Sequence, residues 1–235
     1  LSDAEVEKWN AILADLQQEK PIQYITGEAW FYGLQFEVNE NTLIPRPETE
    51  ELVEWIIESQ KSKVQSQKLE ILDIGTGTGC IPISLKTNLL QANVSAIDVS
   101  EKALEVAKRN AQSNEVEVNF IQTNILEVED LNQHFDIIVS NPPYVRNLEK
   151  QEIKKNVLDY EPHLALFVED TDALLFYRKI AQLALENLSP NGLLFFEINQ
   201  YLGKETVGLL ENLGFKNIEL KKDIYGNDRM IKCSI

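Results

Sequence analysis

The chain has 235 residues, 43% hydrophobic and 26% charged, which is enough to bury the core of one large domain. Its 38 Asp and Glu against 22 Lys and Arg give a formal net charge of −16, and a field of that sign disfavours partners that present phosphates. No apolar run approaches the roughly 20 residues of a membrane-spanning helix, and the first residues lack the order of a signal peptide, so we expect a cytoplasmic protein without membrane or direct nucleic-acid partners.

The amino-terminal part predicts a helix, a hairpin and a second helix. Residues 3–19 carry apolar side chains at helical spacing, with Asp3 in a capping position. The stretch "GEAWFYGLQFEVNE" alternates apolar and polar residues around Gly33, which is typical of a hairpin. Pro47, followed by acidic residues, indicates the first turn of another helix. The polar run 61–68 is the best candidate for a linker.

Beyond this run, short apolar strands alternate with helices. Such alternation requires crossover connections and predicts a mostly parallel sheet with helices on both faces. Two apolar segments around "YGND" close the chain, which suggests an antiparallel edge on the sheet. The predicted strands cover residues 69–74, 94–98, 116–121, 135–140, 193–198, 215–223 and 229–235, and the predicted helices cover 80–90, 100–114 and 172–188.

The sulfur-containing residues are few. Two cysteines, Cys80 and Cys233, support neither a disulfide framework nor a zinc site, so we expect both to be buried small residues in a reducing compartment. Met230 is the only methionine, so we expect the natural chain to begin before Leu1.

A glycine-rich turn follows the first predicted strand of the αβ region. The sequence "LDIGTGTGCI" places Asp73, Gly75, Gly77 and Gly79 between the carboxyl end of that strand and the next helix. Ligands bind at this end of open parallel sheets, where glycine lets the backbone approach them closely. Because the spacing is Gly-x-Gly-x-Gly, a pyrophosphate-binding turn is the weaker interpretation.

Two polar residues follow the next two strands. Asp98 ends the second strand, where a carboxylate can accept both hydrogen bonds of a ribose diol, although capping the helix near Ser100 explains it equally well. Asn124 follows the third strand and can contact an adenine, or serve only as a turn residue. Asp73 can face the amino-acid end of S-adenosylmethionine, or else cap the loop that follows it. Together with Asp98 and Asn124, it favours S-adenosylmethionine as the ligand.

The stretch "SNPPYV" follows the strand at 135–140. Methyl transfer to a planar amide or amine nitrogen needs acceptors for its protons, and the side-chain oxygen of Asn141 and the carbonyl of Pro142 can provide them. Pro142 and Pro143 fix that backbone and bring no competing N–H, while the Tyr144 ring can lie against the flat acceptor group. The alternative, that proline ends the strand and asparagine starts a turn, leaves the tyrosine unexplained.

Three motifs together resemble the PrmC (HemK) family of glutamine methyltransferases: "PIQYITGEAWFYGLQFEVNENTLIPRPETEELVEW", "DIGTGTGCI" and "NPPYV". The resemblance covers nearly the whole chain and implies an α/β, Rossmann-like class I methyltransferase fold. It implies a remnant of a helical substrate-binding domain at 1–20, a hairpin and helix linking block at 21–60 and a catalytic domain at 61–235. The implied reaction methylates the Gly-Gly-Gln glutamine of class 1 peptide release factors with S-adenosylmethionine, giving S-adenosylhomocysteine, and we expect a monomer.

The resemblance also implies roles for particular residues. The catalytic set is Asn141, Pro142, Pro143 and Tyr144. The cofactor-binding set is Asp73, Gly75, Thr76, Gly77, Gly79, Asp98, Asn124 and Asn141. The substrate-binding set is Phe31, Arg46, Glu48, Asn141, Pro142 and Tyr144, with Phe31 packing on the glutamine.

Three positions depart from the family pattern. Asn124 stands where the family usually has Asp, the loop at 168–173 lacks the usual glycine, and Asn199 replaces a common Gly, which leaves the role of Glu197 open. Three alternatives stay open: methylation of a ribosomal-protein glutamine, amino methylation of a nucleic-acid base, and a cofactor-binding scaffold without activity. The second requires a basic face or a target-recognition domain, which the sequence does not indicate.

Overall fold

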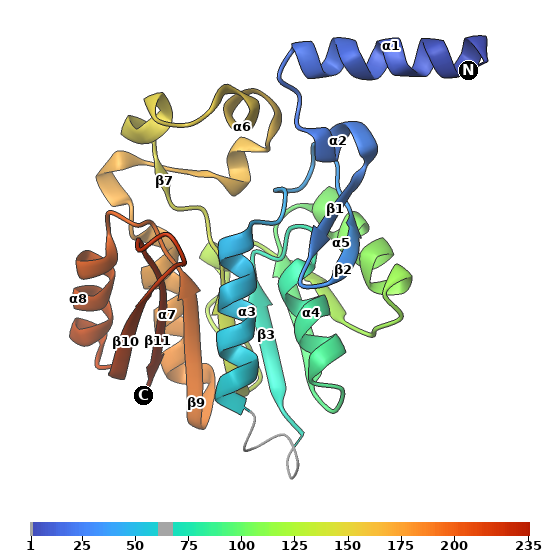
Figure 1. Cartoon of the computed structure of the whole chain (residues 1–235). Coiled ribbons are helices and arrows are strands. Elements are labelled where there is room, and N and C mark those ends of the chain that lie inside the picture. The colour runs from blue at the N-terminus through green and yellow to red at the C-terminus, as the bar shows by residue number, and fades with distance from the viewer. Residues whose placement is uncertain (1, 61–67) are drawn as a thin grey trace.

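The computed structural model describes residues 2–60 and 68–235 and is built around one seven-stranded sheet (Figure 1). The strand order is β10-β11-β9-β6-β3-β4-β5; β5, β4, β3, β6 and β9 are parallel, and β11 pairs antiparallel with both β9 and β10. The mostly parallel sheet with an antiparallel edge is therefore confirmed. Lys68 excepted, the predicted linker lies outside the described residues.

The elements have the following bounds. The large sheet contains β3 (Glu70–Ile74), β4 (Asn93–Asp98), β5 (Asn119–Gln122), β6 (Phe135–Ser140), β9 (Leu188–Glu197), β10 (Lys216–Lys222) and β11 (Asp228–Ser234). The two small sheets pair β1 (Glu28–Phe31) with β2 (Leu34–Glu37) and β7 (Val145–Arg146) with β8 (Phe167–Val168). The α-helices are α1 (Asp3–Gln17), α2 (Ile22–Thr26), α3 (Pro47–Gln60), α4 (Cys80–Asn88), α5 (Glu101–Ser113), α6 (Lys155–Tyr160), α7 (Leu175–Asn187) and α8 (Gly203–Leu213). The 3₁₀ turns are η1 (Ile125–Glu127), η2 (Asn147–Gln151), η3 (His163–Ala165) and η4 (Asp170–Asp172).

Two hydrophobic clusters cover the two faces of the sheet. Ile71 belongs to the cluster under α3, α4 and the β1–β2 hairpin, whereas the next residue, Leu72, belongs to the cluster under α7 and α8. Successive strand residues point to opposite faces, so an apolar strand such as β3 serves both clusters. Cys80 and Cys233 are buried in these clusters, as predicted.

The β1–β2 hairpin turns through Tyr32 and Gly33, both at positive φ (49° and 75°), which suits a tight two-residue connection. Phe31 and Phe36 point into the core, and their rings meet edge to face with centroids 6.1 Å apart. The hairpin prediction is confirmed, and the hairpin shares its core with the large sheet.

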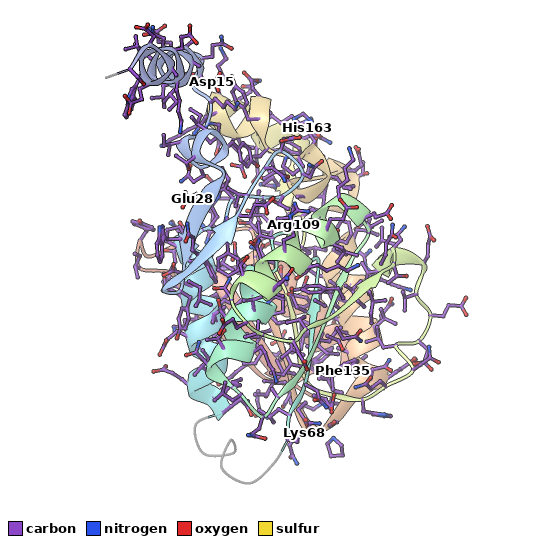
Figure 2. The ribbon with its side chains drawn as sticks, turned by 90° about the vertical axis from the view of Figure 1, so that its right-hand side faces the viewer. Asp15, Glu28, Lys68, Arg109, Phe135 and His163 are labelled. Atoms are coloured by element: carbon purple, nitrogen blue, oxygen red, sulfur yellow. The ribbon has the colours of Figure 1, made fainter. Side chains whose placement is uncertain are left out.

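Helix α1 lies apart from the sheet (Figures 1 and 2). Its N-cap is Ser2 and not Asp3: the Ser2 hydroxyl accepts from the Glu5 amide, and the Glu5 carboxylate accepts from the Ser2 amide. No residue of α1, which is described throughout, is buried. Within the described ranges, no helix is both long and apolar enough to cross a membrane.

Two elements near the carboxyl end differ from the predictions. Helix α8 was not predicted. Strand β9 begins at Leu188, because Leu188 pairs with Phe135 before the register shifts to the pairing of Leu193 with Ile137. The "SPNG" segment, with Asn191 at φ 65°, is therefore a bulge inside the strand.

The carboxyl ends of the parallel strands meet the loops at one end of the sheet. In Figure 2, Lys68 and Phe135, at the amino ends of β3 and β6, lie at the opposite end of the body from His163 in η3. The Gly-rich turn and the Asn-Pro-Pro-Tyr stretch both leave the sheet at the η3 end.

We expect Gly79→Ala to destabilise the protein by about 2–4 kcal/mol, because Gly79 has φ +81° and an added Cβ would lie 2.9 Å from Ile83 Cδ1 and 3.2 Å from Ala107 Cβ. Gly208→Ala in α8 is the matched control, since nothing lies within 4 Å of its added Cβ, and a gain of about 0.5–1 kcal/mol is expected. Denaturant unfolding measures both changes. Equal stability of the two variants would contradict the packing role of Gly79.

Candidate active site

The parallel register of β3 and β6 brings two loops together. Ile74 lies opposite Ser140, and the Ser140 hydroxyl donates to the Ile74 carbonyl at 2.6 Å. A Cβ added at Gly75 would lie 3.9 Å from the carbonyl oxygen of Asn141. Strands β4 and β6 flank β3 on either side, so the chain order reverses here, at the point where open α/β sheets bind ligands.

A cavity of about 280 Å³ opens at this point. Its wall combines the turn after β3, the end of β4, the loop after β5 and the segment after β6. Seven residues predicted from sequence line it: Gly75, Gly77, Asp98, Asn124, Asn141, Pro142 and Pro143. Apolar side chains complete the wall, among them Leu43, Ile97, Leu126, Leu164, Phe176 and Ile180.

The glycines of the turn divide into two groups. Gly75 and Gly77 line the cavity at φ 81° and 54°, and the Gly75 amide donates to the Ile97 carbonyl at 2.8 Å. Gly79 starts α4 against Ala107 and Thr76 is buried, and neither lines the cavity. The turn therefore exposes backbone to a ligand only in its first half.

Asp73 lies under the turn, fully buried. Within the described chain, neither of its carboxylate oxygens has a hydrogen-bond partner. Burial raises the pKa of Asp73 to about 7. The nearby Thr76 hydroxyl, which has no hydrogen-bond partner within the described residues, lowers this pKa, and the charge of Asp98 raises it. Asp73 lines neither cavity, and a buried carboxylate without a donor favours a positive charge nearby, such as the ammonium group of the amino-acid end of S-adenosylmethionine.

Asp98 lines the cavity and also binds two backbone amides, although the N-cap of α5 is Ser100. Its Oδ1 accepts from the Ser100 amide at 2.8 Å, at the start of α5, and its Oδ2 accepts from the Gly77 amide at 2.9 Å. A carboxylate has further lone pairs, so both oxygens can still accept ligand hydroxyls in the cavity. Burial raises the pKa of Asp98, and the backbone donors oppose the shift.

Asn124 also lines the cavity, but its side chain forms local hydrogen bonds. Its Oδ1 accepts from the Leu126 amide at 3.2 Å and its Nδ2 donates to Glu127 at 2.8 Å, which makes it the cap of η1. The side-chain amide of Asn124 is thus used within the turn, as the turn interpretation predicts. Toward a ligand, the residue contributes mainly as part of the cavity wall.

A second cavity of about 50 Å³ adjoins the first. Its lining consists of Leu43, Arg46, Asn141, Pro142, Tyr144, Val145, Ala165, Leu166 and Glu197. Four of these residues line both cavities: Leu43, Asn141, Pro142 and Ala165. Asn141 and Pro142 therefore stand between a larger site and a smaller one.

A chain of polar side chains supports this position. The Nδ2 of Asn141 donates to Thr49 Oγ1 at 3.3 Å, and the Thr49 hydroxyl donates to Glu197 Oε2 at 2.6 Å. The Tyr144 hydroxyl donates to the other Glu197 oxygen at 3.0 Å. Thr49 was not singled out from sequence, and Glu197 was left without a role; the only signal was a carboxylate closing a buried strand.

Burial is the largest influence on the pKa values of Glu197 and Tyr144. It raises the pKa of Glu197, and the hydrogen bond from Thr49, the charge of Arg229 and the hydrogen bond from Tyr144 oppose that rise. Burial also raises the pKa of Tyr144 far above its usual range, followed by the effect of the Glu197 charge. The tyrosine is thus a neutral hydrogen-bond donor.

Arg46 borders the second cavity and forms an ion pair with the buried Glu161, whose other oxygen accepts from the Ile44 amide at 3.1 Å. This carboxylate ties the wall around η3 to the loop before α3. Glu48 is half-buried and lines neither cavity.

The structure corrects the prediction for Phe31. Its side chain is 1% exposed and lines neither cavity, because alternation along β1 turns it into the core beside Phe36. The outward position of the strand belongs to Trp30, which is 70% exposed.

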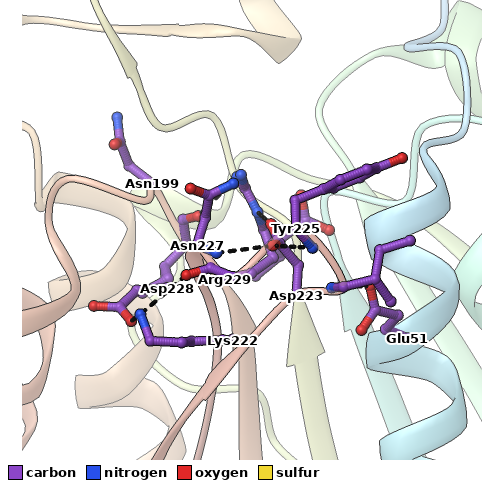
Figure 3. Close-up of polar contacts among 12 residues, drawn as sticks. Glu51, Asn199, Lys222, Asp223, Tyr225, Asn227, Asp228 and Arg229 are labelled. Atoms are coloured by element: carbon purple, nitrogen blue, oxygen red, sulfur yellow. Dashed lines mark hydrogen bonds and ion pairs between the residues drawn. The ribbon is translucent and has the colours of Figure 1, made fainter.

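The turn between β10 and β11 reaches α3 near the site (Figure 3). Asp223 accepts from the amides of Tyr225 and Asn227, at 3.0 and 2.9 Å, and from Arg229 Nε at 3.1 Å. The Ile224 amide donates to Glu51 of α3 at 3.1 Å. This turn holds Arg229 in place.

Asn199 also joins the site to its surroundings. Its Nδ2 donates to the Tyr144 carbonyl at 3.0 Å and to Glu149 Oε2 at 2.8 Å, and its Oδ1 accepts from the Tyr201 amide at 2.9 Å. The departure from glycine at this position thus fixes the backbone that carries Tyr144.

The strand order, the ligand cavity at the reversal point and the Asn-Pro-Pro-Tyr segment define a class I S-adenosylmethionine-dependent methyltransferase. A family profile described as methyltransferase small domain matches residues 54–163. A methyltransferase structure from Pyrococcus furiosus shares the fold, with a TM-score of 0.62 and 20% identity over 94% of this chain and 100% of its own.

Two curated relatives specify the family. The release factor glutamine methyltransferase of Flavobacterium psychrophilum is 68% identical over 100% of this chain and 82% of its own length. That of Bacteroides thetaiotaomicron is 45% identical over 100% of this chain and 83% of its own. The chain belongs to the release factor glutamine methyltransferase family.

We expect the cofactor-free protein to lose stability as pH rises from 3.8 to about 7, and the loss to level off above that pH. Asp73 has a folded-state pKa of about 7, above its ordinary value of 3.8, so its ionisation is costlier in the folded state than in the unfolded state. Asp73→Asn removes this ionisation, and its melting temperature should exceed that of wild type at about pH 7.5 by more than at about pH 5. Thermal unfolding between about pH 4.5 and 8 measures the difference, and a pH-independent difference would contradict it.

Proposed function

We propose that the protein transfers a methyl group from S-adenosylmethionine to the side-chain amide nitrogen of the glutamine in the Gly-Gly-Gln loop of class 1 peptide chain release factors. The main observation in support is that the two cavities share Asn141 and Pro142. A methyl donor in the larger cavity and a glutamine side chain in the smaller one would meet at these residues.

S-adenosylmethionine supplies the activated methyl group. On the cofactor side, we assign the exposed backbone of Gly75 and Gly77 to close contact and Asp98 to the ribose hydroxyls. Asp73 lines neither cavity, so we assign its buried carboxylate to favouring the charge of the ammonium group from under the turn. Asn124 borders the adenine through its place in the wall. Thr76 and Gly79 act indirectly, by shaping the turn that presents this backbone.

On the substrate side, Asn141 Oδ1 and the Pro142 carbonyl accept the two N–H groups of the glutamine amide. These acceptors favour the pyramidal nitrogen that attacks the methyl carbon, and they do so at fixed positions, because Pro142 and Pro143 stiffen the backbone. The Tyr144 ring lines the smaller cavity, and we assign it to contact with the plane of the amide. After transfer, the methylated nitrogen loses one proton to water.

The remaining assignments concern partners and organisation. We assign residues 1–20 to binding of the protein substrate; this is supported by the exposed apolar side chains of α1, which are Val6, Trp9, Leu13 and Leu16. Residues 21–60 link this segment to the catalytic part, 61–235. A cytoplasmic monomer without direct nucleic-acid contacts agrees with the net charge of −16.

A methylation assay with labelled S-adenosylmethionine tests this function. The protein is offered in parallel a class 1 release factor, the same factor with Ala in place of the loop glutamine, ribosomal proteins and bulk nucleic acid, and mass spectrometry locates the methyl group. We expect label on the intact release factor and none on the loop variant. Label only on ribosomal protein or nucleic acid would reassign the substrate, and no label in any arm would favour the scaffold alternative.

Asn141→Ala should lower kcat by on the order of 10²–10³-fold, because it removes one acceptor from the transition state. The variant should still bind S-adenosylmethionine measurably, since most of the larger cavity is unchanged. Steady-state kinetics and calorimetry separate the two effects. Unchanged kcat in a folded variant would refute the role of Asn141.

A further inference from the structure

We propose that Glu197, acting through the Thr49 hydroxyl, is a positioning residue that fixes which way the Asn141 amide faces, so that Oδ1 and not Nδ2 is presented to the reacting nitrogen. This inference rests on the proposed function. It assigns a role to two residues outside the set predicted from sequence.

The argument begins with the single proton of a hydroxyl. Thr49 Oγ1 lies 2.6 Å from Glu197 Oε2 and 3.3 Å from the amide of Asn141. A carboxylate only accepts, so the hydroxyl proton is directed at Glu197 and Oγ1 can only accept from Asn141. The group facing Thr49 must then be Nδ2, which directs Oδ1 away from Thr49.

Glu197 is held as an acceptor from two sides. Glu197 is 1% exposed, and the Tyr144 hydroxyl donates to its second oxygen at 3.0 Å. Burial, the largest effect, raises the pKa of Glu197, whereas the hydrogen bonds from Thr49 and Tyr144 and the charge of Arg229 favour the ionised carboxylate. Arg229 is itself fixed by Asp223 at 3.1 Å, within the β10–β11 turn drawn in Figure 3.

The orientation matters because the two ends of an amide have almost the same shape. Packing by itself does not distinguish oxygen from NH₂ in such a group, so hydrogen bonds must decide. A reversed Asn141 would turn two donors toward a substrate amide that is itself a donor. The acceptor that favours the attacking nitrogen would then be missing, while the cavity kept its shape.

The test compares Thr49→Val with Thr206→Val. Thr206 is an equally buried threonine whose hydroxyl donates within α8 to the Leu202 carbonyl at 2.8 Å, so it controls for loss of a buried hydroxyl. We expect Thr49→Val to lower kcat by about 10–100-fold, by analogy with the loss of a residue that orients a metal ligand through a hydrogen bond. We expect Thr206→Val to leave kcat unchanged. Thr49 and Glu197 do not line the larger cavity, so the Kd for S-adenosylmethionine should match wild type in both variants.

Two further variants test the direction of the chain. Glu197→Gln can donate to Thr49, which would let the hydroxyl turn its proton to Asn141 Oδ1, so we expect a loss of kcat similar to that of Thr49→Val. Thr49→Ser keeps the hydroxyl and should recover most of that loss. Wild-type kcat in Thr49→Val, or no recovery in Thr49→Ser, would overturn the inference.

A measurement without substrate separates this inference from the proposed function. The side-chain NH₂ resonances of Asn141, assigned by their absence in Asn141→Asp, should shift in Thr49→Val and Glu197→Gln but not in Thr206→Val. Unshifted resonances would refute the positioning role even if wild type methylates the release factor. If the resonances shift in these variants but the wild-type protein does not methylate the release factor, the positioning role is supported and the proposed substrate is rejected.

Discussion

The site depends on one constraint, the parallel register of β3 and β6. Because Ile74 lies opposite Ser140, the Gly-rich turn and the Asn-Pro-Pro-Tyr segment leave the sheet side by side, and the Ser140 hydroxyl locks the pair at the Ile74 carbonyl. The side chains of β3 pack into a different cluster on each face, so a slip of one residue would exchange the two sets and disrupt the close packing of both clusters. The packing of the sheet thereby sets the distance between these two loops.

Two buried carboxylates show how the same burial serves different ends. Asp73 has no partner within the described residues, and its burial without a donor favours a cationic ligand. Glu197 is equally buried but accepts from Thr49 and Tyr144, so its charge is used inside the protein to orient other groups. The first is suited to binding and the second to positioning.

The walls of the two cavities are joined by loops distant in sequence. Glu161 connects the segment around η3 to the loop before α3 through Arg46 and the Ile44 amide, so both cavities share one clamped wall. Asn199 holds the Tyr144 carbonyl in a similar way. Asn141 is therefore surrounded by contacts that fix backbone positions and leave the cavities themselves largely apolar.

The sequence by itself determined the alternation of strands and helices, the hairpin around Gly33, and the positions of the Gly-rich turn and the Asn-Pro-Pro-Tyr segment. The periodicity of apolar residues and the presence of turn-forming residues are local signals that a sequence shows directly. It did not reveal α8, the bulge in β9 or the inward direction of Phe31, since each depends on what the segment packs against. Thr49 and Glu197 lie 148 positions apart and form a pair only once α3 covers the end of β9. Hydrogen-bond direction and cavity lining are properties of contacts between distant segments, so only the tertiary structure decided which of the predicted residues line the cavities and which lie behind them.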